Sequence, residues 1–159
     1  MAFDYTTLIT DRSAEDCSRW KTLRDKGWAN MTAAERQDWE VGLKGAYNAA
    51  DLNRVGDAVV HIANRLRAAG NNIEVSPKTD WTREDIPSLA QMVHYLEQIR
   101  KVRDVLAVYQ TTPAVPADTE DLTHGEANDI EKILVDIDQL ITNMIAAYYY
   151  SGELYGGEV

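Results

Sequence analysis

The sequence predicts an all-α fold in which three long helices form an antiparallel bundle. Near the C-terminus, apolar residues recur at alternating spacings of three and four, which places them on one stripe of a long helix. Such a helix is stable in water only when its stripe is buried against other elements. Two further segments show the same periodicity, and little of the chain has the pattern of a strand. The C-terminal stripe consists of Ala127, Ile130, Leu134, Ile137, Ile141, Met144 and Tyr148.

Two short helices are predicted before the bundle, at about residues 12–26 and 32–41. Thr32 and Glu35 match a capping box, in which the hydroxyl and the carboxylate each satisfy a backbone N–H group at the helix start. Ser13 and Asp16 resemble the same motif with a shorter acid. We expect this tryptophan-rich segment, residues 1–48, to pack on one end or one flank of the bundle.

The first long helix is predicted at about residues 49–69, with Gly70 as a left-handed C-cap. Gly56 lies inside it and costs up to about 1 kcal/mol relative to alanine, which indicates close packing against another element. Asp51 suits the positive end of the helix dipole. We expect Asn53 and Arg54 to fix the preceding turn. The apolar stripe is Leu52, Val55, Val59, Ile62 and Leu66.

The second long helix is predicted at about residues 86–108, with Pro87 in the first turn, where a proline loses no needed donor. Residues 111–121 follow as a stiff connector that contains two prolines. The expected stripe is Leu89, Met92, Leu96, Ile99 and Leu106, and the expected exposed side carries Arg100, Lys101 and Arg103.

The third long helix is predicted at about residues 123–148, opening with a capping box at Thr123 and Glu126. Gly152 is expected to close it within a few residues. Residues 151–159 then form a short polar tail. With 159 residues, the chain fits a single helical domain with a core of its own.

The composition disfavours several classes of partner. The net charge is −10, and from Pro116 onward ten acids stand against Lys132 alone. Nucleic acids and anionic membrane surfaces require a basic face, so both are disfavoured. No apolar run approaches the length of a membrane span, and the first residues do not form a signal peptide. The lone Cys17 fits a reducing compartment and is expected to be a structural residue.

The sequence has no pattern of catalytic, cofactor-binding or metal-binding residues. We therefore predict no catalytic site, no cofactor site and no metal site. The histidines at positions 61, 94 and 124 lack the spacing of a helical metal site. No nucleophile elbow, phosphate loop or dinucleotide fingerprint occurs. Acids on the back of the last helix are expected to be solvated; they are Asp129, Glu131, Asp136 and Asp138.

The aromatic residues are more informative about function. Burial within the chain is the expectation for Trp20, Trp28, Trp39 and Trp81, with a sugar-stacking platform as the alternative. Three consecutive tyrosines on a helix cover a wide arc, so at least one is expected to contact another subunit. Together with nearby apolar and acidic residues they define the candidate interface: Tyr148, Tyr149, Tyr150, Leu154, Tyr155, Asp136 and Asp138.

Several sequence blocks, in order and spacing along nearly the whole chain, resemble an uncharacterised family encoded in phages and prophages of Gram-positive, mostly anaerobic, bacteria. The matching residues are 8–12 (LITDR), 26–32 (KGWANMT), 42–48 (GLKGAYN), 51–55 (DLNRV), 79–82 (TDWT), 84–87 (EDIP), 128–132 (NDIEK) and 149–153 (YYSGE).

The resemblance implies a module of the phage tail, in the baseplate or fibre region, with no catalytic residues to carry over. We therefore expect a non-enzymatic component that docks on other tail proteins and forms a homo-oligomer. It would be made in the cytoplasm of the host bacterium and carried on the virion. Two alternatives remain: a receptor- or carbohydrate-binding module of the tail tip, and a small acidic regulatory protein that binds a basic host partner. Enzymatic activity is the class that the sequence favours least.

Overall fold

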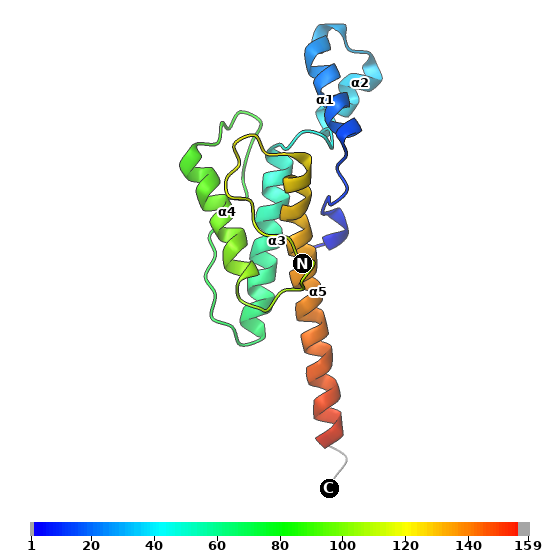
Figure 1. The fold of residues 1–159 in the computed structure, drawn as a ribbon. Helices are drawn as coiled ribbons and strands as arrows, with labels where there is room; N and C mark the ends of the chain where they lie inside the picture. The colour runs from blue at the N-terminus through cyan, green and yellow to red at the C-terminus, as the bar shows by residue number, and fades with distance from the viewer. Residues whose placement is uncertain (1, 156–159) are drawn as a thin grey trace.

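The chain is all-helical over the residues that the computed structural model describes, which are 2–155 for the backbone and 2–149 for the side chains. Figure 1 shows three long helices packed together and a separate pair of short helices beyond one end of them. The elements in chain order are η1 (Tyr5–Thr7), α1 (Ala14–Lys26), η2 (Trp28–Asn30), α2 (Ala33–Val41), α3 (Ala49–Ala68), α4 (Leu89–Arg103) and α5 (His124–Tyr155). The predicted all-α fold class and the bundle of three long helices are confirmed. The predicted antiparallel arrangement is wrong: α3, α4 and α5 all begin at the same end of the bundle, because each of the two connectors crosses back along it (Figure 1).

Each α-helix begins with a capping box. The pairs predicted from the sequence, Ser13 with Asp16, Thr32 with Glu35, and Thr123 with Glu126, all form. The structure adds two further boxes that the sequence analysis did not identify. They are Asn48 with Asp51 at α3 and Ser88 with Gln91 at α4. Each box satisfies two backbone donors that would otherwise lack a partner.

The bundle core lies between α3, α4 and α5, which all pack on one another. Because every helix turns an apolar stripe inward, their branched side chains share a single buried cluster. Residues missed by the predicted stripes, Tyr95, Val102 and Ile133, are also buried there. The largest fully buried apolar side chains are Val55, Ile62, Leu66, Leu96, Ile99, Ile130, Ile133, Leu134, Ile137 and Ile141.

Helix α3 matches its predicted bounds to within one residue. At its end, the N–H of Asn71 bonds to the carbonyl of Leu66 and that of Gly70 to the carbonyl of Arg67. This is a Schellman motif, and Gly70 has the φ of +92° that it requires. The close packing predicted at Gly56 is present: a Cβ there would lie 2.9 Å from Thr79 Cγ2 and 3.0 Å from the carbonyl oxygen of Lys78.

Helix α4 is shorter than predicted at both ends. It begins at Leu89 rather than residue 86 because Ser88 is the N-cap, which leaves Pro87 outside the helix and Leu89 75% exposed. It ends at Arg103 rather than residue 108. Arg103 Nε donates to the carbonyl of Pro113 at 2.8 Å, and Arg100 Nη2 to that of Pro116 at 2.6 Å. These two arginines therefore hold the connector instead of facing solvent.

Helix α5 is longer than predicted, since it continues through Gly152 to Tyr155. A glycine lowers helix propensity but keeps its N–H, so it does not oblige a helix to stop. Residues 151–155 of the predicted polar tail are thus helical, and residues 156–159 lie outside the described chain. With 32 residues, α5 is about 48 Å long against about 30 Å for the 20 residues of α3.

The N-terminal helices lie at one end of the bundle and leave its flanks uncovered (Figure 1). Helices α1 and α2, joined by η2, form a hairpin that projects from the end of the bundle where α3 and α5 begin (Figure 1). We call this hairpin the arm. Its small interior contains the buried Leu23 and Met31, and Lys26 pairs with Glu35 at 2.6 Å. Only the residues that precede α1 lie along the bundle, with Leu8 in its core.

Candidate functional site

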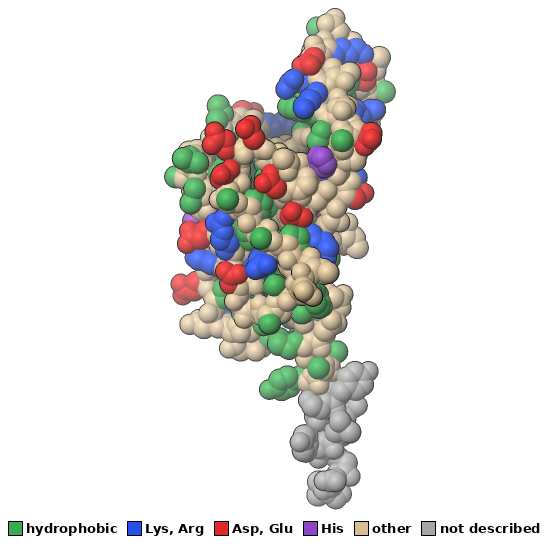
Figure 2. Space-filling model, in the orientation of Figure 1, with side chains coloured by type: hydrophobic (Ala, Val, Ile, Leu, Met, Phe, Trp, Pro, Cys, Tyr) green, Lys and Arg blue, Asp and Glu red, His purple; other side chains and the backbone are tan. Residues whose placement is uncertain are grey.

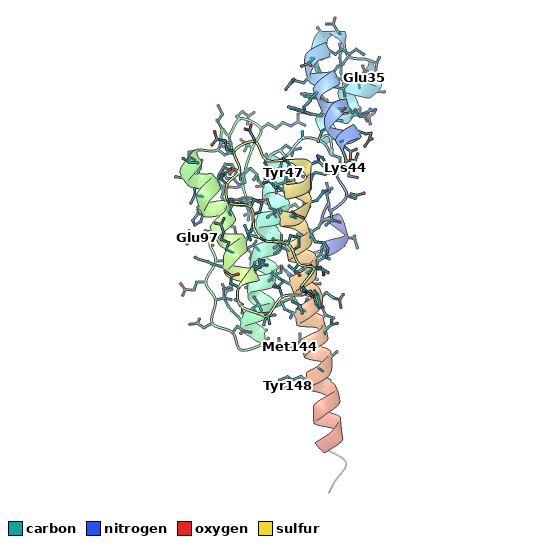
Figure 3. The ribbon with its side chains drawn as sticks, in the orientation of Figure 1. Glu35, Lys44, Tyr47, Glu97, Met144 and Tyr148 are labelled. Atoms are coloured by element: carbon teal, nitrogen blue, oxygen red, sulfur yellow. The ribbon has the colours of Figure 1, made fainter. Side chains whose placement is uncertain are left out.

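The far end of α5 is the part of the described chain with the clearest features of an interface. Figure 1 shows α5 continuing past the ends of α3 and α4, and Figure 3 places Tyr148 on this part. The heptad spacing of the buried stripe continues into it without a break, through Met144 to Tyr148. Tyr148 is 81% exposed and Tyr149 75%, and Ile145 is also exposed. We call residues 142–155 the α5 projection.

The α5 projection also differs from the rest of the chain in charge: on the face shown in Figure 2, acidic and basic side chains lie over the arm and the bundle but not on the described part of the projection. Residues 139–152 contain no charged side chain, although the protein carries a net charge of −10. An exposed helix of a monomeric protein usually has charged residues on its outer face. The predicted interface residues Tyr150, Leu154 and Tyr155 also belong to this segment, but their side chains lie outside the described residues.

The two acids of the predicted interface are bound within the chain. Asp136 is buried, accepts a hydrogen bond of 2.7 Å from Thr112 Oγ1, and pairs with Lys132. Asp138 pairs with Arg65 of α3. The prediction of solvated acids is therefore wrong for Asp136. These contacts attach the connector and α3 to α5, so they do not present a charged face to a partner.

Glu131, another acid predicted to be solvated, is fully buried in an ionic cluster where α3, α5 and the N-terminal segment meet. Its Oε1 accepts from Arg12 Nη2 at 2.6 Å and from Arg54 Nη2 at 2.7 Å. Its Oε2 accepts from the N–H of Ile9 at 2.6 Å and from Arg54 Nε at 3.0 Å. Asp51 pairs with both arginines. The two positive charges of the arginines thus balance the two negative charges of Asp51 and Glu131.

The cluster attaches the N-terminal segment to the bundle. Asn128 forms two hydrogen bonds with the backbone of Arg12. Its Oδ1 accepts from the N–H of Arg12 and its Nδ2 donates to the carbonyl of Arg12, both at 2.9 Å. Burial by itself lowers the pKa of Arg54, but hydrogen bonds and charges from Glu131 and Asp51 outweigh it and hold the pKa above its ordinary value. Arg54 therefore spans two helices and does not merely fix the turn before α3.

A pair of phenols lies beside this cluster. The hydroxyls of Tyr47 and Tyr95 are 2.5 Å apart, and the guanidinium of Arg12 lies 5.3 Å from the centre of the Tyr47 ring. Burial raises the pKa of both tyrosines above the ordinary value of 10.0. Because the oxygens of Glu131 are all occupied and the phenols are held neutral, this cluster suits a structural clamp.

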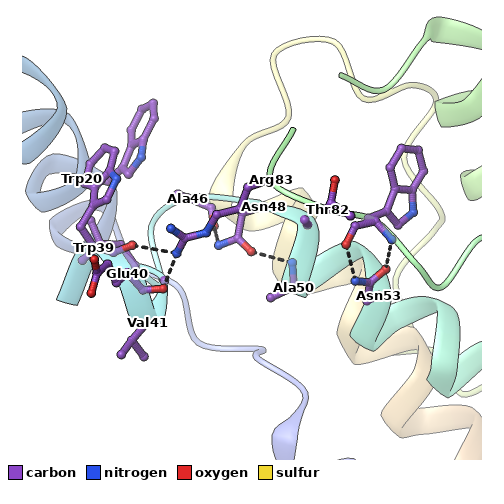
Figure 4. A pocket seen from close by; sticks show the side chains of 14 residues that line it. Trp20, Trp39, Glu40, Val41, Ala46, Asn48, Ala50, Asn53, Thr82 and Arg83 are labelled. Carbon is purple, nitrogen blue, oxygen red and sulfur yellow. Dashed lines mark hydrogen bonds between the residues drawn. The ribbon is translucent and has the colours of Figure 1, made fainter. Parts of the chain in front are cut away.

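A cleft lies between the arm and the bundle (Figure 4). Its volume is about 490 Å³, and three of the four tryptophans line it: Trp20 from α1, Trp39 from α2 and Trp81 from the loop before α4. All four tryptophans were expected to be buried. This is confirmed for Trp81, whereas Trp20 and Trp39 are half-buried and Trp28 is 47% exposed.

The loop wall of this cleft is held by polar contacts. Asn53 Oδ1 accepts from the backbone N–H of Trp81 at 2.8 Å, and Asn53 Nδ2 donates to its carbonyl at 2.9 Å. Asn53 thus positions the loop and not the turn before α3. Arg83 crosses the cleft and donates to the backbone carbonyls of Trp39 and Glu40 at the end of α2 (Figure 4). Its charge is favourable there because it faces the negative end of the helix dipole.

Other reactive side chains are dispersed. His61 shares a hydrogen bond of 2.8 Å with the Tyr5 hydroxyl, and His94 one of 2.9 Å with the carbonyl of Ser76. Cys17 is half-buried. Within the described residues, no group of three or more histidine, cysteine or acidic side chains is arranged to hold a metal ion. Nor is any described helix both long and apolar enough to cross a lipid bilayer.

Comparisons of the chain with protein-family models, curated proteins and solved structures gave no match.

Sequence reasoning singled out the tyrosines of the α5 projection but did not predict that the helix extends beyond the bundle, and it missed the ionic cluster and the cleft. Arg12, Asp51 and Glu131 are separated by 39 or more positions, and nothing in their local spacing links them. The i, i+3 pair of Asp51 and Arg54 was the one local signal. The tryptophans were recognised as a possible platform, but their convergence depends on how the arm is set against the bundle.

Proposed function

We propose that the chain is a non-enzymatic structural or assembly component of a phage or prophage tail, in the baseplate or fibre region, acting through protein–protein docking. Its partners are other tail proteins and further copies of the chain. The family resemblance along nearly the whole sequence supports the tail assignment. The docking role rests on the α5 projection, a helical segment that is uncharged through residue 152 and exposes Ile145, Tyr148 and Tyr149.

The physical argument begins with helix stability. The base of the α5 projection is held to the bundle, because Thr142 accepts a hydrogen bond from Arg65 and Asn143 donates one to Tyr109. A partner that covers the exposed apolar residues beyond this point would add the tertiary packing that stabilises a helix in water. Tyrosine supplies a large contact area at low conformational cost, which suits an interface. The heptad pattern of apolar residues continues into the α5 projection, so a second helix could pack along the projection as in a coiled coil. Because residues 139–152 are uncharged, two copies can pair there without the repulsion that the acidic remainder of the chain would cause.

The alternative of a regulatory protein with an acidic docking face has less support. Three of the acids that would form this face, Glu131, Asp136 and Asp138, are paired with arginine or lysine inside the chain. A basic partner would have to compete with these short intramolecular ion pairs.

The proposal is tested by asking whether the chain is carried on particles. Phages induced from a host that encodes it are purified, and their proteins are identified by mass spectrometry. We expect the chain in the tail fraction, and we expect it to capture neighbouring tail gene products from an extract. An Ile145→Asp variant should lose this capture, because a charge at the interface centre would have to be desolvated. Absence from both particles and captured complexes would contradict the proposal.

A further inference from the structure

The cleft between the arm and the bundle has the composition of a ligand site. Small-molecule sites commonly have volumes of 300–1,000 Å³ and combine aromatic walls with a few polar groups. The cleft, at about 490 Å³, is within this range. Its walls come from two separate parts of the molecule, with Trp20 and Trp39 on the arm and Asn48, Ala50 and Thr82 on the bundle side (Figure 4).

The tryptophans of the arm supply the stacking faces. Arg24 already covers one face of Trp20, with its guanidinium 4.9 Å from the ring centre, so Trp20 has one face left for a ligand. Trp20 and Trp39 are only half-buried, although both line the cleft. None of the hydrogen bonds found among the described residues uses either indole N–H, so each ring offers an apolar face and a polar edge. Trp81 also lines the cleft, but it is only 6% exposed. Since an indole face is the negative part of its quadrupole, it attracts polarised C–H groups.

The charge of the lining narrows the class of ligand. Glu40 is its one acid and Arg83 its one base, so the cleft has no net charge. Arg83 also already donates to the carbonyls of Trp39 and Glu40, which leaves the cleft poorly suited to a phosphate or another strong anion. The amides of Asn48 and Asn53 are already hydrogen-bonded to the backbone. A purely aliphatic ligand would instead cover the indole N–H groups of Trp20 and Trp39 without replacing their lost hydration.

We propose that this cleft binds a short, neutral saccharide. A pyranose ring carries C–H groups on one face and hydroxyls around its edge, which matches indole faces surrounded by polar side chains. This assignment goes beyond the proposed docking function and is independent of it, since the arm, which forms one wall of the cleft, and the α5 projection lie at opposite ends of the bundle (Figure 1).

The test uses the tryptophans as reporters. Intrinsic fluorescence of the full chain is titrated with maltotriose, cellotriose and triacetylchitotriose up to millimolar concentrations. We expect a saturable change in intensity or a blue shift with at least one of them. A Trp39→Leu variant should bind about tenfold more weakly, because a stacking face is lost. Trp28→Phe is the matched control, since Trp28 does not line the cleft, and it should bind like the wild type.

A second variant tests saccharide binding without changing a tryptophan, in case Trp39→Leu disturbs the fold of the arm. Ala50 is exposed at the start of α3 and lines the cleft, so Ala50→Phe should fill the space while both stacking rings remain. We expect it to abolish the fluorescence change at an unaltered melting temperature. No saturable change with any of the three sugars would overturn the proposal, as would binding that is unaffected by both Ala50→Phe and Trp39→Leu.

Discussion

At the scale of single residues, the structure depends most on Glu131. One fully buried carboxylate accepts four hydrogen bonds and joins α5 to α3 and to the N-terminal segment. Such a cluster need not be more stable than an apolar core of equal volume. Removing one partner is costly, however, because the remaining charges stay buried without compensation.

Glu131→Gln should therefore lower the free energy of unfolding by about 3 kcal/mol, since Arg12 and Arg54 would lose the charge that offsets their burial. Denaturant unfolding followed by circular dichroism measures this change. Glu97→Gln is the control, because Glu97 is exposed on α4 and should stay within about 0.5 kcal/mol of the wild type (Figure 3). Equal stability of the two variants would mean that the cluster is not a clamp.

The acids of the capping boxes make stability depend on pH. Hydrogen bonds from Lys26 and Thr32 lower the pKa of Glu35, and those from Thr123 lower the pKa of Glu126, below the ordinary value of 4.5. A lowered pKa in the folded state contributes stability above 4.5 that is lost as the pH falls through the folded value. We expect urea midpoints to fall on acidification below pH 4.5, and less steeply in Glu35→Gln. Identical pH profiles would contradict this.

At the scale of elements, α3 is fitted closely to the loop that crosses it. Gly56→Ala would raise intrinsic helix propensity, but its Cβ would meet the loop backbone at Lys78 and the methyl group of Thr79. We expect a net destabilisation of about 1–3 kcal/mol from this overpacking. Gly125→Ala in α5 is the matched control, because the nearest atom would be 3.8 Å away, and it should be neutral or stabilising. Thermal unfolding distinguishes the two.

The arm is a second element whose attachment can be tested. Arg83 joins it to the bundle by donating to the last carbonyls of α2. Arg83→Ala should therefore speed amide hydrogen exchange in α1 and α2 while leaving the protection of α3, α4 and α5 unchanged. Lys101→Ala, an exposed change on α4, is the control. Unaltered exchange in the arm would show that Arg83 does not hold it.

At the scale of the whole molecule, local signals predicted much of the architecture. The apolar stripes located α3 and α5, and the capping boxes at Thr32 and Thr123 fixed two helix starts, because these motifs act over a few residues. The predicted start of α4 was wrong because Pro87 was assigned to the first turn, whereas the capping box of Ser88 and Gln91 starts the helix at Leu89. The burial of Glu131 and the position of the arm were not predictable, since both arise from contacts between distant segments.

The central claim is that the α5 projection associates with a partner, in the simplest case a second copy. Light scattering of the purified chain measures it most directly. We predict a mass of at least twice the 17.9 kDa of one chain. In Tyr149→Ala we expect the mass to shift toward that of the monomer, with little change in melting temperature. Val93→Ala, which alters an exposed apolar residue of α4, should leave the mass unchanged. A monomeric wild type, or a Tyr149→Ala variant that melts earlier without dissociating, would contradict the account.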